Sequence, residues 1–151
     1  MKAITHLAFF AVGSALVGSA FAKTPEGWST DLEKALEQAK KEKKSVLVEF
    51  TGSDWCAPCI AVKKAVLSKK EFTDKASEKF ILVELDFPKS DEALAKKNEP
   101  IREKYEVEGF PTVLLLTPEG KQFSTFNPAG FMKVDAFLAH LDAELEKKEL
   151  D

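Results

Sequence analysis

The sequence predicts an α/β domain in which a central mixed β-sheet carries helices on both faces. Three observations lead to this fold class. Short apolar runs rich in β-branched residues alternate with segments of helical periodicity, which is typical of βαβ units. Three of these runs are almost continuously apolar, as in strands that are buried on both faces. The last two runs are joined by a turn and not by a helix, which indicates a terminal hairpin.

The first half of the domain is predicted to contain two helices and one buried strand. The stretch TDLE at 30–33 has the form of a capping box with Thr30 as its cap, and apolar residues at helical spacing follow as far as the lysine-rich run 40–44. The run SVLVEF at 45–50 is short and apolar, which predicts a buried strand. A loop at 51–55 then leads into a helix that we expect from Cys56 to Lys69.

The second half is predicted to complete the sheet. Its expected elements are a strand at 80–87, a helical segment at 91–105, strands at 112–117 and 121–126 joined by a turn at 118–120, and a helix at 131–147. Pro100 interrupts the helical segment, and because proline lacks an N–H we expect it to begin a second helix or to kink the first.

Residues 1–22 are predicted to be a secretory signal peptide. Lys2 precedes an apolar stretch, and Ala20-Phe21-Ala22 matches the small–x–small pattern before a cleavage site. The apolar stretch 7–22 is shorter than the roughly 20 residues of a membrane-spanning helix. Cleavage after Ala22 would release a domain at 23–151 into the periplasm or the medium. An uncleaved membrane anchor is the alternative.

The composition excludes some classes of partner. The chain has 22 basic and 25 acidic residues and a formal net charge of −3, so no basic excess points to nucleic acid or to anionic lipid. The domain is of ordinary size for a single core, and we expect a monomer. Export would place it in an oxidising compartment, where disulfides persist.

The two cysteines, Cys56 and Cys59, are the centre of the functional prediction. A closed zinc site needs four ligands, and the remaining candidate, His140, is distant on the last helix, where we expect it at the surface or half-buried. A hydrolytic cysteine needs a histidine base, and only His140 is available. A structural disulfide across two residues would close too small a loop to add more than roughly 2 kcal/mol. Redox cycling fits the local chemistry better than these three alternatives.

The predicted helix start suits a reactive thiol. Free N–H groups and the helix dipole at this end favour the thiolate of Cys56, which is the attacking species in disulfide exchange. Cys59 lies one turn further on, shielded, where it can displace a sulfur that Cys56 has captured. Pro58 is tolerated in the first turn. Trp55 would form a flat apolar wall beside the nucleophile, or else pack the loop.

The sequence resembles the thioredoxin superfamily. The resemblance rests on WCAPC at 55–59 after a buried strand and on GFPT at 109–112 before the third strand, and it covers about 46–145. It implies a thioredoxin fold, with Cys56 as attacking thiol and Cys59 as resolving thiol. It also implies that Pro111 follows a cis peptide bond and lies against the disulfide. The alternative is that Pro111 follows a trans peptide bond and only begins a strand.

The resemblance further implies a substrate site beside the cysteines. An extended substrate strand would pair with backbone groups near Phe110, and Trp55, Phe110, Pro111 and Thr112 would contact it. The Cys56–Cys59 disulfide would be the redox group, with no other cofactor and no metal.

Glu49 is the one acid in its apolar strand. A buried acid has a raised pKa and can exchange a proton near neutrality. Many thioredoxins carry a proton-accepting aspartate at this point of the strand. Glu49 matches that aspartate if the loop TGSD at 51–54 is one residue longer than is usual in the family. The alternative is a strand-end acid that reaches water. Glu84 stands where many thioredoxins place a lysine, so we expect no lysine–carboxylate coupling of that kind.

The function implied by the resemblance is that of an exported thiol–disulfide oxidoreductase acting on protein disulfides. The dipeptide Ala57-Pro58 lacks the histidine associated with oxidants and isomerases, which favours a reductase supplied by a membrane-bound thiol donor. An oxidase or isomerase is the first alternative. A non-enzymatic module that binds extended peptides through Phe110, Phe126 and Phe131 is the second. The long segment 88–105 could shape a partner surface or be a solvated charged helix.

Overall fold

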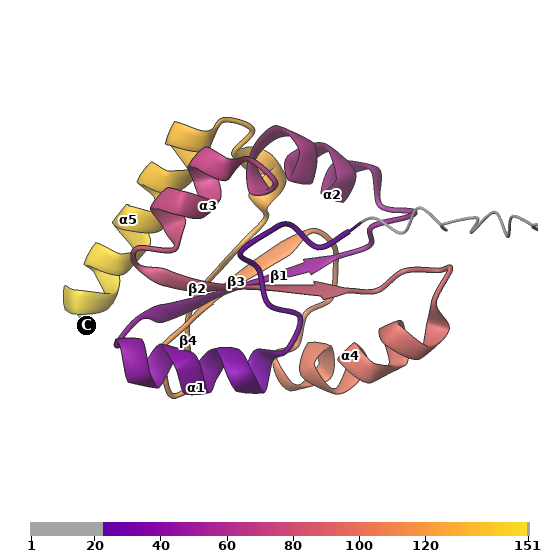
Figure 1. Ribbon diagram of the computed structural model, residues 1–151, viewed down its shortest axis with the longest axis horizontal. Coiled ribbons are helices and arrows are strands. Elements are labelled where there is room, and N and C mark those ends of the chain that lie inside the picture. Colours follow the sequence, from indigo (N-terminus) through magenta and orange to yellow (C-terminus); the bar gives the residue numbers. More distant parts are fainter. Residues whose placement is uncertain (1–22, 151) are drawn as a thin grey trace, which may run out of the picture.

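The computed structural model describes residues 23–150, and the predicted signal peptide at 1–22 lies outside them. One four-stranded sheet has the order β2-β1-β3-β4 (Figure 1). Its strands are β1 (Ser45–Thr51), β2 (Phe80–Asp86), β3 (Thr112–Leu116) and β4 (Gln122–Phe126). β1 runs parallel to β2 and antiparallel to β3, and β4 pairs antiparallel with β3. The predicted mixed sheet with its terminal hairpin is therefore confirmed.

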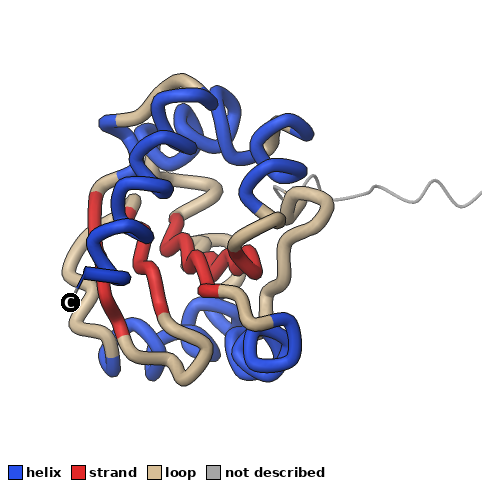
Figure 2. The backbone as a smooth tube through the Cα atoms, turned by 90° about the vertical axis from the view of Figure 1, so that its left-hand side faces the viewer, coloured by secondary structure: helices blue, strands red, loops and turns tan. Residues whose placement is uncertain are grey.

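Helices cover both faces of this sheet, as predicted. They are α1 (Leu32–Glu42), α2 (Ala57–Val62), the π-helical turn η1 (Lys63–Leu67), α3 (Lys70–Ala76), α4 (Glu92–Lys104), the 3₁₀ turn η2 (Pro128–Gly130) and α5 (Val134–Leu150). α1 and α4 lie on one side of the sheet, whereas α2, α3 and α5 lie on the other (Figure 1). Seen from the side, the strands run between the two helical layers (Figure 2).

The alternation of β1 divides the core into two layers. All seven residues of β1 are buried. Leu47 packs in the layer under α2, α3 and α5 with Phe72 and Phe137, whereas Val48 packs on the opposite face under α1. Because successive strand side chains alternate, Glu49 shares the face of Leu47. The strand therefore places a carboxyl group inside the layer that α2 covers.

Two helices differ from the prediction in how they begin or continue. The cap of α1 is Asp31, not Thr30: its backbone is extended and its carboxylate accepts the Lys34 N–H at 3.1 Å. The Ser29 hydroxyl accepts the Asp31 N–H, which satisfies that donor. α4 is one helix that passes through Pro100, so the expected second segment is absent. Asp91 caps α4 by accepting the Leu94 N–H at 3.0 Å.

The helix expected from Cys56 to Lys69 is present as α2 and the π-helical turn η1, which follows it without a break and ends at Leu67. α2 ends at Val62, η1 follows, and Lys69 has an extended backbone before α3, which the prediction lacks. The Ser68 hydroxyl donates to the Lys63 carbonyl at 2.8 Å where η1 ends. Phe72 of α3 is fully buried against Trp28 and Phe137, so tertiary packing stabilises this short helix.

The last helix begins at Val134 and not at Phe131, because residues 127–130 form a separate capped turn. The Asn127 side chain accepts the Ala129 N–H at 2.9 Å and so caps η2. β4 begins at Gln122, one residue later than expected. Within residues 23–150, none of the helices combines the length and the apolar character that crossing a bilayer requires.

Candidate active site

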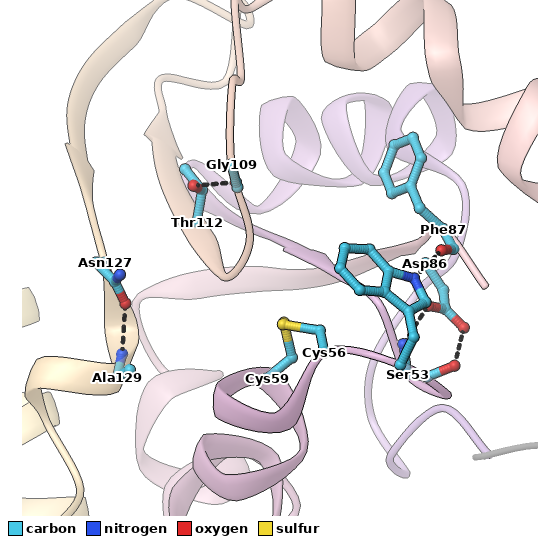
Figure 3. The surroundings of a disulfide bond; sticks show 10 residues. Ser53, Cys56, Cys59, Asp86, Phe87, Gly109, Thr112, Asn127 and Ala129 are labelled. Atoms are coloured by element: carbon cyan, nitrogen blue, oxygen red, sulfur yellow. Dashed lines mark hydrogen bonds between the residues drawn. A yellow bond between two sulfur atoms is a disulfide. The ribbon is translucent and has the colours of Figure 1, made fainter. Parts of the chain in front are cut away.

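Cys56 and Cys59 form a disulfide at the start of α2 (Figure 3). The S–S distance is 2.10 Å and the two Cα atoms are 5.2 Å apart. Cys56 is the N-cap of α2; its N–H donates to the Gly52 carbonyl at 2.9 Å and its carbonyl accepts the Ile60 N–H at 3.0 Å. Cys56 is 4% exposed and Cys59 is 0% exposed. The surface available to an attacking sulfur in this form therefore belongs to Cys56.

The Trp55 side chain is partly exposed to solvent and also packs within its own loop. Its side chain is 41% exposed, while its indole Nε1 donates to the Phe87 carbonyl at 2.8 Å. The Lys89 ammonium lies 5.2 Å from the ring centroid. A Cβ added to Gly52 would lie 2.5 Å from the indole ring, so glycine is needed there for the ring to keep its position.

The loop before Cys56 is hydrogen-bonded to the last residue of β2 and to the segment that follows this strand, a contact that no motif in the sequence predicts. The Ser53 N–H donates to the Asp86 carboxylate at 2.9 Å, and the Ser53 hydroxyl donates to its second oxygen (Figure 3). The Asp54 carboxylate accepts the N–H groups of Lys89 and Ser90 at 2.9 and 2.8 Å. These hydrogen bonds lower the pKa of Asp54. Two carboxylates therefore fix the position of the WCAPC segment.

The loop before β3 lies across the disulfide from this segment. The Phe110–Pro111 peptide bond is cis, as the resemblance implied. The Phe110 ring lies edge-on to Trp55, with centroids 5.8 Å apart, and 5.0 Å from Phe87. The Thr112 hydroxyl donates to the Gly109 carbonyl at 2.7 Å (Figure 3). The fold thus gathers the predicted residues of both loops around one disulfide, and adds Phe87.

Glu49 is completely buried in β1, on the sheet face that α2 covers. Its side chain is 0% exposed, and neither carboxyl oxygen has a hydrogen-bond partner among residues 23–150. Burial, as the main cause, and the charge of Glu84, as the second, together raise the pKa of Glu49 from 4.5 to about 8, whereas Lys63 lowers this pKa by a smaller amount. The alternative of a strand-end acid that reaches water is therefore wrong.

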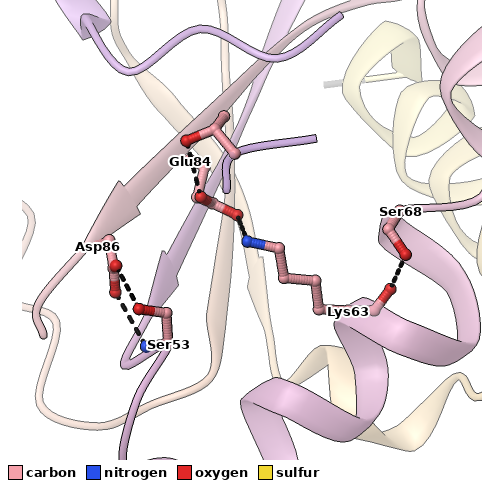
Figure 4. A network of polar contacts seen from close by, with 6 residues as sticks. Ser53, Lys63, Ser68, Glu84 and Asp86 are labelled. Atoms are coloured by element: carbon pink, nitrogen blue, oxygen red, sulfur yellow. Dashed lines mark hydrogen bonds and ion pairs between the residues drawn. The ribbon is translucent and has the colours of Figure 1, made fainter. Parts of the chain in front are cut away.

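Glu84 is paired with a lysine that the sequence analysis did not predict, and this lysine comes from η1 and not from β2. The Lys63 ammonium of η1 lies 2.6 Å from the Glu84 carboxylate, and Thr24 donates to its other oxygen at 3.1 Å (Figure 4). Glu84 is 2% exposed. Burial raises the pKa of Glu84, and the hydrogen bond from Lys63 opposes this shift. The lysine comes from a helix 21 residues earlier in the chain, so no local pattern in β2 could reveal it.

The remaining candidates pack into the core. His140 is half-buried between Phe131, which stacks on it at 4.3 Å, and Phe126, which meets it edge-on at 4.4 Å. Both phenylalanines are partly buried against the core layer that α5 covers. Within the described range 23–150, no group of three or more His, Cys, Asp or Glu side chains is arranged to hold a metal ion.

A sequence model of the thioredoxin-like family matches residues 27–118. These residues include the disulfide, Glu49 and the cis-proline loop.

Curated relatives are proteins of thiol–disulfide exchange. Disulfide bond reductase DsbH of Chlamydia pneumoniae is 37% identical over 108 residues, which are 68% of this chain and 64% of DsbH. Thioredoxin-related protein DsbJ of the same organism is 32% identical, over 63% of this chain and 28% of DsbJ. Thiol:disulfide interchange protein DsbD of Vibrio cholerae is 30% identical, over 74% of this chain and 18% of DsbD. The chain thus spans less than two thirds of each of these relatives.

Solved structures share the fold. The structure of the DsbH oxidoreductase superposes with a TM-score of 0.71 at 31% identity, covering 90% of this chain and 96% of that one. The C-terminal domain of DsbD from Neisseria meningitidis, in its oxidised form, gives a TM-score of 0.57 at 22% identity over 78% of this chain and 98% of the domain. On its sequence and its fold, this chain belongs to the thioredoxin-like family.

Proposed function

We propose that this protein is an exported thiol–disulfide oxidoreductase that reduces disulfides of extracytoplasmic proteins. The observation that carries the proposal is the Cys56–Cys59 disulfide, in which Cys56 alone retains exposed surface, set between Trp55 and the cis-Pro111 loop. The printed names of the relatives, disulfide bond reductase and thiol:disulfide interchange protein, support the same class of reaction.

The reducing half-reaction begins with the dithiol. The Cys56 thiolate attacks one sulfur of a substrate disulfide, a mixed disulfide forms, and the other substrate sulfur leaves as a thiolate that takes up a proton. Cys59 then loses its proton and attacks the Cys56 sulfur. The protein disulfide forms, and the second substrate sulfur leaves with its electron pair and is protonated. Two electrons pass from the protein to the substrate, and the two released substrate thiolates take up their protons from solvent.

Glu49 is the proton acceptor for Cys59 in this proposal. It lies on the sheet face that α2 covers, and its pKa of about 8 is close to the pH at which the reaction runs. A group that accepts a proton when the disulfide closes must return it when the disulfide opens. Glu49 therefore holds the proton in the disulfide form and supplies it to the Cys59 sulfur when that sulfur is released.

The substrate chain binds across the two loops that flank the disulfide. Trp55, Phe110, Pro111 and Thr112 contact it, with the Trp55 ring as the exposed apolar surface. Phe87 supports the Phe110 ring from behind. Most contacts are to the backbone of an extended strand, which leaves the enzyme free to accept different sequences.

A reductase in an oxidising compartment needs a source of electrons. We propose a membrane-bound thiol protein as the donor, in keeping with the similarity to the interchange proteins named DsbD. The predicted signal peptide, with cleavage after Ala22, would bring the domain to the same compartment.

Equilibration with glutathione buffers tests both the class and the direction of the reaction. The Cys56–Cys59 pair should interconvert reversibly between dithiol and disulfide in the folded protein, with a midpoint potential nearer to about −270 mV than to about −120 mV. The reason is that Ala57-Pro58 provides no histidine to stabilise the Cys56 thiolate, so the reduced form is the less favoured one.

Two results would contradict the proposal in different ways. A disulfide that is reduced only when the domain unfolds would be a structural bond, and the catalytic proposal would fail. A reversible couple near about −120 mV, in the range of strong oxidants, would keep the oxidoreductase and reverse its direction.

A further inference from the structure

Lys89 is held in place beside the two residues that precede the attacking cysteine. The Asp54 carboxylate accepts the backbone N–H groups of Lys89 and Ser90 at 2.9 and 2.8 Å. Two residues before Lys89, the Phe87 carbonyl accepts the indole N–H of Trp55 at 2.8 Å. The chain around Lys89 is therefore bound to the active-site loop at three points, and these hydrogen bonds restrict where the Lys89 side chain can reach.

The Lys89 ammonium group lies on the exposed ring of the same loop. Its Nζ is 5.2 Å from the Trp55 ring centroid, which is within the range of a cation–π contact, and both side chains are exposed. Among residues 23–150, no carboxylate lies within 4.0 Å of this Nζ. Asp54 binds the backbone of Lys89 and not its ammonium group. The positive charge is therefore accessible to a molecule that binds over Trp55.

This charge borders the surface over which the substrate chain is proposed to bind. Trp55 directly precedes Cys56 in the sequence, and its ring centroid is 5.8 Å from that of Phe110 in the cis-proline loop. Phe87 packs against Phe110 at 5.0 Å and lies on the same side of the disulfide as the loop before Cys56 (Figure 3). Lys89 thus lies at the edge of an aromatic group that joins the two loops beside the disulfide.

We propose that Lys89 is a specificity-determining residue, which selects protein disulfides that carry Asp or Glu next to the reactive cysteine. This inference rests on the proposed function and adds the class of substrate to it. While Cys56 attacks the substrate sulfur, a carboxylate on the neighbouring substrate residue lies near the ammonium group and is attracted by it. Asp54 is a positioning residue, because it acts on the substrate only by holding Lys89.

Two peptides that differ only in charge measure this selection. Each contains one cysteine in a disulfide with the chromophore thionitrobenzoate, flanked on both sides by Glu in one peptide and by Gln in the other. The Cys56 thiolate of the reduced protein attacks the peptide sulfur, and thionitrobenzoate leaves with the electron pair and is followed by its absorbance. Cys59, once deprotonated, attacks the Cys56 sulfur, which re-forms the protein disulfide and releases the peptide thiolate.

The measured quantity is the rate constant for the Glu peptide divided by that for the Gln peptide. This ratio should fall by about two- to fivefold in Lys89→Gln, which is the range for one exposed charge pair. Lys89→Arg keeps the charge and should keep the ratio, whereas Lys89→Glu should lower it further than Lys89→Gln does. The exposed acids Glu106 and Glu108 of the cis-proline loop are the same in every variant, so their effect cancels in the comparison.

The ionic strength gives an independent test of the same charge. Raising it from about 0.01 M to about 1 M shortens the screening length from about 30 Å to about 3 Å. The ratio of the wild type should therefore approach that of Lys89→Gln at high salt, and the ratio of Lys89→Gln should change less.

Lys104→Gln is the matched control. Lys104 is exposed, and its Nζ also lies 5.2 Å from an aromatic ring centroid, that of Tyr105. The Tyr105 hydroxyl donates to the Gly120 carbonyl in the turn that follows β3, whereas the cis-proline loop precedes β3. This ring therefore extends toward the end of the sheet opposite the disulfide, and Lys104→Gln should keep the wild-type ratio.

Two results would overturn the proposal. The first is an equal ratio in the wild type, Lys89→Gln and Lys104→Gln. The second is an equal change in the rates of both peptides in Lys89→Gln, because Lys89 would then act on the Cys56 thiolate and not on the substrate. Neither result depends on the direction of the reaction in the cell, because thionitrobenzoate disulfides react with accessible thiolates in general. The glutathione equilibrium tests that direction separately.

Discussion

Replacing Cys56 by serine is expected to reduce the rate of insulin disulfide reduction in the presence of dithiothreitol to the rate of dithiothreitol alone. Serine cannot form a disulfide, and its hydroxyl group is far less ionised than a thiol, so no mixed disulfide is made. The fold should persist, because Cys56 caps α2 with its backbone and not with its side chain. Turbidity of precipitating insulin chains gives the rate, and circular dichroism checks the fold.

Ala57→Ser is the matched control for this variant. It places the same hydroxymethyl group on the neighbouring exposed residue and leaves both sulfurs in place. We expect it to keep most of the wild-type rate. If Cys56→Ser reduced insulin as fast as Ala57→Ser, the disulfide would be incidental, and a peptide-binding module without redox activity would remain.

Glu49 is expected to make the disulfide form less stable as the pH rises from about 4.5 to about 8. In this interval the folded protein keeps the Glu49 proton, since its pKa is about 8, whereas the unfolded chain has released it at 4.5. The folded state therefore binds more protons, and the free energy of unfolding falls with pH until the folded carboxyl group also ionises. A shift of this size corresponds to a loss on the order of 5 kcal/mol, complete above about pH 8.

Denaturant unfolding of the oxidised protein at several pH values measures this loss. Glu49→Gln should remove most of the decline between pH 5 and pH 8, apart from the smaller part that arises from Glu84, whose pKa is also raised. Glu37→Gln changes an exposed acid on α1 and should keep the wild-type decline. An equal decline in Glu49→Gln and the wild type would mean that Glu49 is ionised in the folded protein at neutral pH.

The sheet is the part of the fold that the sequence predicts best. The runs at 45–50, 80–87 and 112–117 are predominantly apolar, and each lies within one residue of β1, β2 or β3. The helical layer over the site is less predictable. α3 has one fully buried large side chain, Phe72, and its N-cap Lys69 makes no side-chain capping bond, so tertiary packing and not local sequence determines where it begins.

The disulfide and the cis-proline loop are also predictable, because each lies within a short motif that can be seen in the sequence. The charge arrangement beneath them is not. Lys63 and Glu84 are paired because η1 passes over β2, and the Asp54 and Asp86 carboxylates bind backbone groups more than 30 residues away. Such contacts depend on the packing of elements that are distant in the sequence, and no spacing rule encodes them.

Trapping of the mixed disulfide tests the central claim, that Cys56 attacks and Cys59 resolves. Cys59→Ala and Cys56→Ala are purified from the native compartment without reductant, and covalent adducts are mapped by non-reducing gels and mass spectrometry. Cys59→Ala should carry protein adducts on the Cys56 sulfur, because no second thiol is present to displace them. Cys56→Ala should carry few or none, since Cys59 is fully buried. A Cys59→Ala protein free of adducts while the wild type is active, or adducts of equal amount on Cys59 in Cys56→Ala, would contradict these roles.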